Sequence, residues 1–307
     1  MNNPFKDIVD KQSSYKRYYK HDVSPPVGGI TICIKDNKII EIHDGSGWIH
    51  PSRKKQYIYM IENCLKNHNV RDGNVNINLS DHPRTGVFNF CRKKGNFTQF
   101  LLPTFRFNIT DIKIKQDQPI LNTIDDVKTY IRDLYTDYKI NKIYMSCIPH
   151  PAKVPYFKHA LCNPDTCHGY AYIGSCHGSV GIPNDMIPKL LERGMCGKEL
   201  MDWAEHLKYK YILYTDGNTL SDRMNLLLCS DCIVVKFNSP YEEFFSELLE
   251  NNVNYVEIGC YDELNTVINN STYDIIPHNN KVFMDTVLTY DNVLKYVADI
   301  LNELISK

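Results

Sequence analysis

The sequence predicts a mixed α/β protein, and three observations lead to this prediction. The chain has 307 residues, of which 43% are hydrophobic and 23% charged, so it can bury the core of one large domain or two medium ones. Strand-like and helix-like segments alternate in both halves of the chain. No internal repeat or low-complexity linker interrupts them. This alternation is typical of parallel-rich sheets covered by helices, here with a boundary near residue 140.

The first half has a β–α–β–loop–β pattern. Its strands follow from alternation of apolar side chains and its helices from apolar side chains at helical spacing. In order, we expect an irregular entry or short helix at 1–25, a hairpin at 28–42 that turns at Asp36 and Asn37, a helix at 54–67, strands at 75–79 and 87–90, and a helix at 125–138 capped by Thr123.

The second half continues the alternation after a long stretch rich in Pro, Gly, Cys and His. In order, we expect a strand at 142–145, irregular structure at 146–183, helices at 184–193 and 197–207, a strand at 209–215, a helix from Ser221 to Cys229, a strand at 232–236, a helix at 242–249, a strand at 255–258, and helices at 262–269 and 290–305.

Composition and charge exclude several classes of protein. With 35 basic and 36 acidic side chains the net charge is −1, which disfavours non-specific nucleic-acid binding. No run of 18 apolar residues is present, so no membrane span is expected. The N-terminal residues lack the pattern of a secretory signal, and the 11 cysteines are expected to be reduced thiols. A cytoplasmic location is expected, with a virus factory or virion as the other candidate.

The clearest pattern for function is the strand, turn and helix at 209–229. Free backbone N–H groups at the start of a helix favour an anion such as phosphate. Arg223 is expected at the second or third helical position, where its guanidinium could bind the same anion, a contact worth about 1.5–3 kcal/mol. Gly217 is a single glycine and matches no nucleotide-binding motif. A helix cap followed by a surface arginine explains the pattern equally well.

The same segment carries a resemblance to a known family. Residues 209–229 (YKYILYTDGNTLSDRMNLLLC) and 76–83 (NINLSDHP) resemble the most specific blocks of the CAP10-like glycosyltransferases, family 90. Weaker matches follow in the family's order, and the resemblance spans about residues 28–305. These weaker blocks are VFNF at 87–90, LPTF at 102–105, YEEFF at 241–245, NYV at 254–256 and the spacing of the terminal helix.

The resemblance implies a GT-B fold with two Rossmann-like domains facing a central cleft. Residues 1–140 would form the acceptor-side domain and 141–289 the nucleotide-sugar-binding domain, with the helix at 290–305 packing back on the first. The implied reaction moves glucose or xylose from a UDP-sugar to a hydroxyl of a glycan or protein, with inversion and without a metal or other cofactor. Asp81 would be the general base, because a hydroxyl is a poor nucleophile until a carboxylate takes its proton.

The resemblance also assigns the donor-binding residues. Gly217, Ser221 and Arg223 would hold the diphosphate. Glu243 could accept from sugar or ribose hydroxyls, although a solvated carboxylate on a helix fits as well. Asp81 itself could be an ordinary Asp in a turn before proline.

Three more residues are candidates for acceptor or sugar contacts. His82 and Arg84 flank Asp81, and Tyr241 could stack on a sugar ring. Loop surface and core packing are the competing explanations.

The loop after the strand at 142–145 departs from the family. Ser146-Cys-Ile replaces the usual Arg-Gly-Ser, and the arginine expected about ten residues further on is absent. Lys153, Lys158 or His159 must then replace it at the donor, and Lys158 is our choice.

A second hypothesis is a catalytically inactive binding or scaffold protein on the same fold, clipped by zinc. Thiolates and imidazoles are preferred zinc ligands, but the spacing here matches no common zinc motif. The candidate ligands are Cys162, Cys167, His168, Cys176 and His177.

Overall fold

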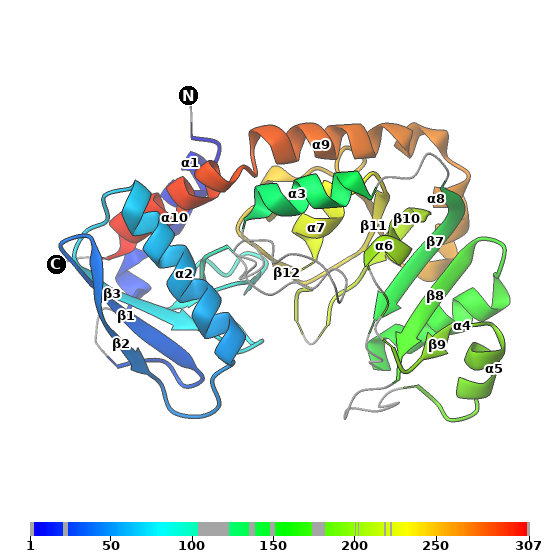
Figure 1. The fold of residues 1–307 in the computed structure, drawn as a ribbon, viewed down its shortest axis with the longest axis horizontal. Coiled ribbons are helices and arrows are strands. Elements are labelled where there is room, and N and C mark those ends of the chain that lie inside the picture. Colours follow the sequence, from blue (N-terminus) through cyan, green and yellow to red (C-terminus); the bar gives the residue numbers. More distant parts are fainter. Residues whose placement is uncertain are drawn as a thin grey trace.

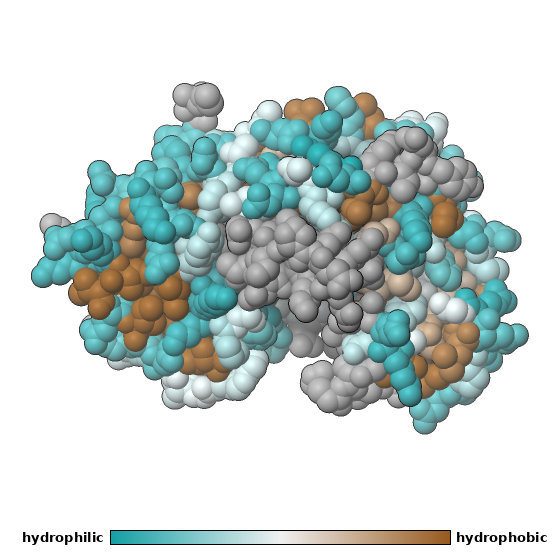
Figure 2. All heavy atoms as spheres, viewed as in Figure 1, coloured by the Kyte–Doolittle hydropathy of each residue, from teal (hydrophilic) through white to brown (hydrophobic). Residues whose placement is uncertain are grey.

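The computed structural model shows two α/β units joined side by side (Figure 1). The residues that it describes are 3–20, 24–103, 123–134, 139–147, 151–173, 182–199, 201, 203–217, 219–221 and 223–305. Among them, no helix combines the length and apolar character needed to cross a bilayer. The face shown in Figure 2 is largely hydrophilic, with apolar residues gathered in a few groups over both units. The predicted α/β class is confirmed.

The N-terminal unit is built on a five-stranded sheet. Its strands, in spatial order, are β2 (Lys38–Asp44), β1 (Gly29–Lys35), β3 (Gly73–Asn78), β4 (Phe88–Asn89) and β6 (Phe100–Leu101). β1 is antiparallel to both of its neighbours, whereas β3, β4 and β6 are parallel. The sheet is therefore mixed rather than wholly Rossmann-like. α2 (Pro51–Asn67) lies across the hairpin strands and buries its apolar stripe against them (Figure 1).

The hairpin between β1 and β2 follows from its turn residues. Asp36 and Asn37 both have positive φ angles, 49° and 57°. A two-residue hairpin turn requires such angles, and Asp and Asn tolerate them better than most residues. The predicted hairpin and its turn are confirmed.

The C-terminal unit is built on a six-stranded sheet in which every pairing is parallel. Its strands, in spatial order, are β13 (Val256–Ile258), β11 (Ile233–Phe237), β10 (Tyr209–Tyr214), β7 (Ile140–Cys147), β8 (Cys167–Tyr172) and β9 (Cys196–Gly197).

The two faces of this sheet belong to different cores, because successive side chains of a strand point to opposite sides. Tyr211 and Leu213 of β10 pack in one core with α4 (Val154–Cys162), α5 (Ile187–Glu192) and α8 (Leu264–Ile268). Ile212 and Tyr214 face the other core, which holds α7 (Met224–Cys229) and α3 (Ile124–Asp133) and continues into the N-terminal unit.

The chain returns to the N-terminal unit at its end. α9 (Ile276–Thr286) runs along the C-terminal unit, and α10 (Tyr290–Leu304) packs against α1 (Lys6–Ser13) and α2 (Figure 1). The buried Tyr296 hydroxyl donates to the carbonyl of Leu101 (2.8 Å) and accepts from Gln12 Nε2 (2.7 Å). Gln12 Oε1 accepts from Leu101 N (2.6 Å). This closed set of bonds ties α1, β6 and α10 together.

A short sheet also links the units. β5 (Arg92–Lys93) pairs antiparallel with β12 (Tyr241–Glu242). The Arg92 side chain, 1% exposed, donates through Nε to Glu242 (2.5 Å) and through Nη2 to Glu247 (3.0 Å).

Several expected elements differ from the structure. The stretch at 146–183 contains α4 and β8, and α9 was not expected. The helix expected at 242–249 is replaced by β12 and a single 3₁₀ turn at Ser246–Leu248, because Glu242 pairs with Arg92 across the strands. The helix expected at 197–207 is limited, in the described residues, to α6 (Trp203–His206). The cap of α3 is confirmed, since Thr123 and Asp126 form a capping box.

We expect Tyr296→Phe to lower the free energy of unfolding by about 1–3 kcal/mol, because it leaves Gln12 Nε2 and the Leu101 carbonyl buried without their partner. Urea unfolding followed by circular dichroism measures the change. Tyr18→Phe, at a tyrosine that is 41% exposed, is the control and should change stability by no more than about 0.5 kcal/mol. An equal, small effect of both variants would contradict the role given to Tyr296.

Candidate active site

Two loops from different units meet at the centre of the molecule. One follows β3 and carries Asp81, and the other follows β10 and carries Asp216 to Leu220. Thr219 Oγ1 donates to the backbone carbonyl of Asp81 at 2.8 Å. Cys91, on the N-terminal side, also interacts with the Thr219 side chain and the Leu220 backbone. The structure therefore brings together the two segments that the sequence singled out.

The Asp81 carboxylate is held from one side by α2. Arg53, in the first turn of this helix, donates through Nη2 to Asp81 Oδ1 (2.7 Å) and through Nη1 to the carbonyl of Leu79 (2.8 Å). The Arg53 side chain is 16% exposed and that of Asp81 is 39% exposed. The carboxylate is thus fixed in direction while remaining open to solvent.

Two buried asparagines shape the loop around Asp81. Asn78 Nδ2 donates to the carbonyl of His82 (2.7 Å) and to Asn89 Oδ1 (2.9 Å). Asn89 in turn binds the backbone N–H and carbonyl of Arg84. His82 and Arg84 are therefore anchored by their backbones, and both residues are exposed beside Asp81.

An exposed aromatic residue lies on the N-terminal side of this region. The Trp48 side chain is 75% exposed, and its ring meets that of His50 at 5.2 Å, edge to face. His50 is close enough to Arg53 and Asp81 for both to affect its pKa. Burial, reinforced by the Arg53 charge, lowers the pKa of His50, and the Asp81 charge opposes this shift. The imidazole beside the candidate base is consequently biased toward its neutral form.

The turn after β10 differs from the expected helix cap. α7 begins at Met224 with Arg223 at its N-cap, and no side chain caps it. The prediction that Ser221 caps the helix is wrong. The Tyr214 hydroxyl donates to the Ser221 carbonyl, so that carbonyl is already engaged, and the first helical bond runs from Leu227 N to the Arg223 carbonyl. Gly217 lies in open space, since among the described residues an added Cβ would meet only the Thr219 carbonyl, at 4.0 Å.

Two cationic side chains lie side by side at this edge of the sheet. Arg223 donates through Nη1 to the carbonyl of Ser146 at the end of β7 (2.9 Å) and through Nε to Ser221 Oγ (3.2 Å). Lys153, immediately before α4, is only 7% exposed. Burial lowers the pKa of Lys153, the Arg223 charge adds to this, and Cys147 and Asp216 oppose it.

Of the three candidates to replace the missing arginine, Lys153 is the one beside Arg223. Lys158 is exposed further along α4, and His159 is half-buried there, 3.9 Å from Asp262.

Carboxylates complete the site. Asp216 Oδ2 accepts from Ser239 Oγ (2.6 Å), while Oδ1 is buried and has no hydrogen-bond partner among the described residues. Burial raises the pKa of Asp216, opposed by the Ser239 hydrogen bond and by the charges of Lys236, Lys153 and Lys94.

Glu243 is 4% exposed and lies close enough to Lys236 to affect its pKa, so it is not a solvated helix-face carboxylate. Tyr241 is half-buried on β12.

The arrangement suits an anionic ligand that also carries hydroxyl groups. Ser146 lies near the carboxyl end of β7, and Asp216 and Ser239 follow the adjacent parallel strands β10 and β11. Ligands bind at the carboxyl edge of such sheets. Arg53, Thr219 and Asp216 were not predicted from the sequence to lie at this site. Asp216 could have been found from its position directly after a buried strand, but the contacts of Arg53 and Thr219 cross between units and leave no local pattern.

The sequence-derived zinc candidates do not assemble in the described part of the chain. Cys162 is exposed on α4, whereas Cys167 is buried on β8. His168 follows directly in the strand, so it points to the opposite face, where its ring stacks near Tyr209 at 5.9 Å. Cys176 and His177 lie outside the described residues. The described cysteines are free thiols, as expected.

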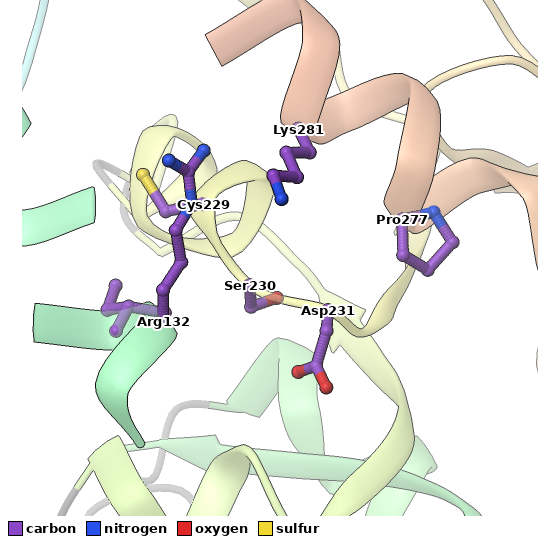
Figure 3. A pocket seen from close by; sticks show the side chains of 7 residues that line it. Arg132, Cys229, Ser230, Asp231, Pro277 and Lys281 are labelled. Atoms are coloured by element: carbon purple, nitrogen blue, oxygen red, sulfur yellow. The ribbon is translucent and has the colours of Figure 1, made fainter. Parts of the chain in front are cut away.

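A separate pocket of about 330 Å³ lies between α3, the end of α7 and α9 (Figure 3). Arg132, Asp231 and Lys281 line it. Arg132 is paired with Asp285 and Asp231 with Lys139, so two of its three charges are engaged within the protein. It is not part of the arrangement around Asp81.

Comparisons with known proteins give a family and weak structural likenesses. Residues 189–306 match the model of glycosyl transferase family 90. No curated protein matches the chain. Two solved structures are similar over 55% of this chain: TarM, with 16% identity and a TM-score of 0.39, and the pneumococcal O-GlcNAc transferase GtfA in complex with UDP and GlcNAc, with 12% identity and a TM-score of 0.28.

The chain spans 36% and 33% of the lengths of those two proteins. The family match includes Arg223, Tyr241 and Glu243 and does not reach Asp81. It covers β10, the turn after it and everything that follows to α10. The similarity to glycosyl transferase family 90 therefore covers residues 189–306, which is less than half of this chain.

Proposed function

We propose that this protein transfers glucose or xylose from a UDP-sugar to a hydroxyl group, with inversion and without a metal. Asp81 is the general base, and Arg223 and Lys153 hold the diphosphate. The observation that carries the proposal is the 2.8 Å bond from Thr219 Oγ1 to the Asp81 carbonyl, which joins the base loop to the donor loop. The family match supports glycosyl transfer, and the identity of the sugar rests on the resemblance alone.

We place the diphosphate of the donor at the neighbouring cations Arg223 and Lys153. In transfer with inversion, negative charge grows on the departing UDP, and fixed donors aimed at that charge lower the barrier. Arg223 is held by the Ser146 carbonyl, and Lys153 is buried beside it. Two adjacent cations with little solvent repel each other until an anion binds between them, which makes the site selective for a multiply charged group.

The hydroxyl groups of the donor are placed at Asp216. Its Oδ1 is buried without a hydrogen-bond partner in the described residues, and a buried acceptor of this kind costs free energy until it is used. A ribose or sugar hydroxyl would satisfy it. Glu243, which the sequence suggested for this contact, is buried near Lys236, so Asp216 is the better candidate.

The acceptor is placed on the N-terminal side of the site. The Asp81 carboxylate is half exposed and oriented by Arg53, so it can take a proton from a hydroxyl that arrives from solvent. The exposed Trp48, with His82 and Arg84, supplies surface for the rest of the acceptor. Aromatic rings of this kind offer apolar contact beside polar groups.

Donor identity is tested first. A panel of UDP-sugars is screened for thermal stabilisation and for release of UDP, because a ligand that binds only the folded state raises its stability. Absence of binding by every UDP-sugar in the panel would instead support the scaffold hypothesis.

Asp81→Asn is expected to reduce transfer about 10²- to 10⁴-fold while UDP binds as before, because the amide keeps an oxygen for Arg53 but cannot accept a proton. Product formation by chromatography and UDP affinity by calorimetry measure the two effects. Asp165→Asn, at an exposed aspartate, is the control. Retained turnover in Asp81→Asn would falsify the assignment of the base.

Arg223→Ala is expected to weaken UDP binding about 10- to 150-fold, which corresponds to losing a charge-assisted contact of about 1.5–3 kcal/mol. Calorimetric titration with UDP measures the affinity. Arg193→Ala, at an exposed arginine after α5, is the matched control. Unchanged affinity in Arg223→Ala removes this residue from the donor site.

Lys153→Met is expected to weaken UDP binding without lowering stability, because it removes a cation that burial and Arg223 disfavour. The pKa of Lys153 is lower in the folded state than the ordinary 10.5, so the unfolded chain binds more protons between these values. The stability of the wild type relative to Lys153→Met should therefore rise as the pH increases toward 10.5.

Urea unfolding over this pH range measures the relative stability of the wild type and Lys153→Met. Lys158→Met separates the two lysines. If Lys158→Met weakens UDP binding and Lys153→Met does not, the donor lysine is Lys158.

A further inference from the structure

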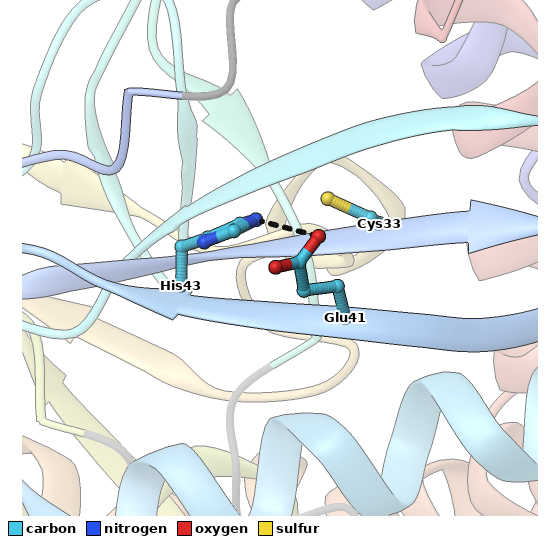
Figure 4. Close-up of side chains that lie close together, drawn as sticks. All are labelled: Cys33, Glu41 and His43. Atoms are coloured by element: carbon cyan, nitrogen blue, oxygen red, sulfur yellow. Dashed lines mark ion pairs between the residues drawn. The ribbon is translucent and has the colours of Figure 1, made fainter.

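Three potential metal ligands meet on one face of the N-terminal hairpin. Cys33 lies on β1, and Glu41 and His43 lie on β2 (Figure 4). One ligand atom from each lies within 4.8 Å of the other two, and His43 Nε2 is 3.3 Å from Glu41 Oε2. Cys33 is buried, His43 is half-buried and Glu41 is exposed, so solvent reaches the group from the side of the carboxylate.

Strand pairing explains why these side chains converge. Cys33 is directly opposite Glu41 in the antiparallel register, and His43 is two residues beyond Glu41 on the same face of β2. Directly opposite side chains start about 4.5–5.5 Å apart, and diagonal ones about 7–8 Å. Next to this pair the register shifts, because Ile34 pairs with Ile39 and leaves Ile40 as an extra residue. Such bulges redirect side chains in the bulged strand.

The ligand chemistry selects the metal. We infer that Cys33, Glu41 and His43 bind one zinc ion, with water in the fourth position. Zinc takes sulfur at about 2.3 Å, nitrogen at about 2.0–2.1 Å and carboxylate oxygen at about 2.0–2.2 Å, so tetrahedral ligands lie about 3.5 Å apart. The observed spacing needs a contraction of no more than about 1.3 Å, which the exposed Glu41 side chain supplies by rotation. Cys33 binds as the thiolate and releases its proton to the buffer.

The imidazole of His43 gives an independent indication of a ligand. Its Nε2 atom is buried, and its contact with Glu41 lacks the geometry of a hydrogen bond, so it has no such partner in the described residues. A buried ring nitrogen in this condition costs free energy that a metal bond would recover.

The zinc group is separate from the candidate active site. Gly29 pairs with Asn78 near the Asp81 loop, whereas Cys33 pairs with Asn74 near the other end of β3. The four residue-to-residue steps from Gly29 to Cys33 span about 13 Å. The ion would clip the edge strand β2 to β1, and it takes no part in sugar transfer. The inference therefore does not depend on the proposed function.

The test is a titration of the purified, metal-free full chain with zinc, with a chromophoric chelator as competitor, and a parallel titration with cobalt. The wild type should bind one zinc per chain, and bound cobalt should give the near-ultraviolet absorption of a thiolate-to-metal transition. Losing one ligand should weaken binding about 100-fold or more, since losing even a supporting partner costs about 10- to 100-fold. The variants are Cys33→Ser and His43→Gln, with circular dichroism to confirm folding.

Two control variants test whether zinc binding depends on Cys33 rather than on any thiol of the chain. Cys162→Ser and Cys260→Ser remove exposed thiols elsewhere and should leave zinc affinity unchanged. His43→Gln changes a partly exposed side chain, so it remains informative if Cys33→Ser destabilises the hairpin. The inference is overturned if the wild type binds no stoichiometric zinc at micromolar concentrations, or if His43→Gln binds it as tightly as the wild type.

Discussion

The buried contact of Arg92 with Glu242 fixes how the two units meet, and the candidate site depends on it. Arg92 belongs to β5 and Glu242 to β12, so the ion pair lies within the strand pairing that joins the units. Removing water from such a pair costs free energy, and the second bond, from Arg92 Nη2 to Glu247, and the Phe97 ring under the guanidinium offset part of that cost. Apolar side chains alone would let β5 and β12 pair in more than one register, whereas the ion pair of Arg92 with Glu242 favours the observed register.

The register of β5 against β12 determines which loops lie next to each other at the candidate site. β12 leads into Glu243, and β5 follows Cys91, so both flank the loop that carries Thr219. The β5–β12 pairing and the packing of α10 on α1 and α2 both join the units, and the loops holding Asp81 and Asp216 meet between them. The proposed base on one unit and the proposed anion site on the other are then held at a fixed separation by the frame that carries their loops.

The sequence predicted most of the elements that depend on local chemistry. The hairpin at Asp36 and Asn37 and the cap at Thr123 are short-range features, and both were predicted correctly. Errors arose where a distant partner decides the outcome. Glu242 forms a strand because Arg92 pairs with it, and Ser221 fails as a cap because the Tyr214 hydroxyl takes its carbonyl. The contacts of Arg53 and Thr219 could not be predicted for the same reason, because each residue contacts Asp81, which is distant in the sequence and close only in the folded chain.

Because Ser221 does not cap α7, the proposed anion site depends on side chains rather than on a helix N-terminus. A helix of six residues whose N-cap is itself an arginine contributes little dipole, so the positive field must come from side chains. Lys153 and Arg223 provide it, at the cost of holding two like charges together with limited solvent. Asp216 relieves part of this repulsion, but it is itself only partly satisfied. The free protein thus holds two cations that repel each other and a buried carboxylate oxygen without a hydrogen-bond donor among the described residues. A ligand that carries a diphosphate and a hydroxyl group would satisfy both at once.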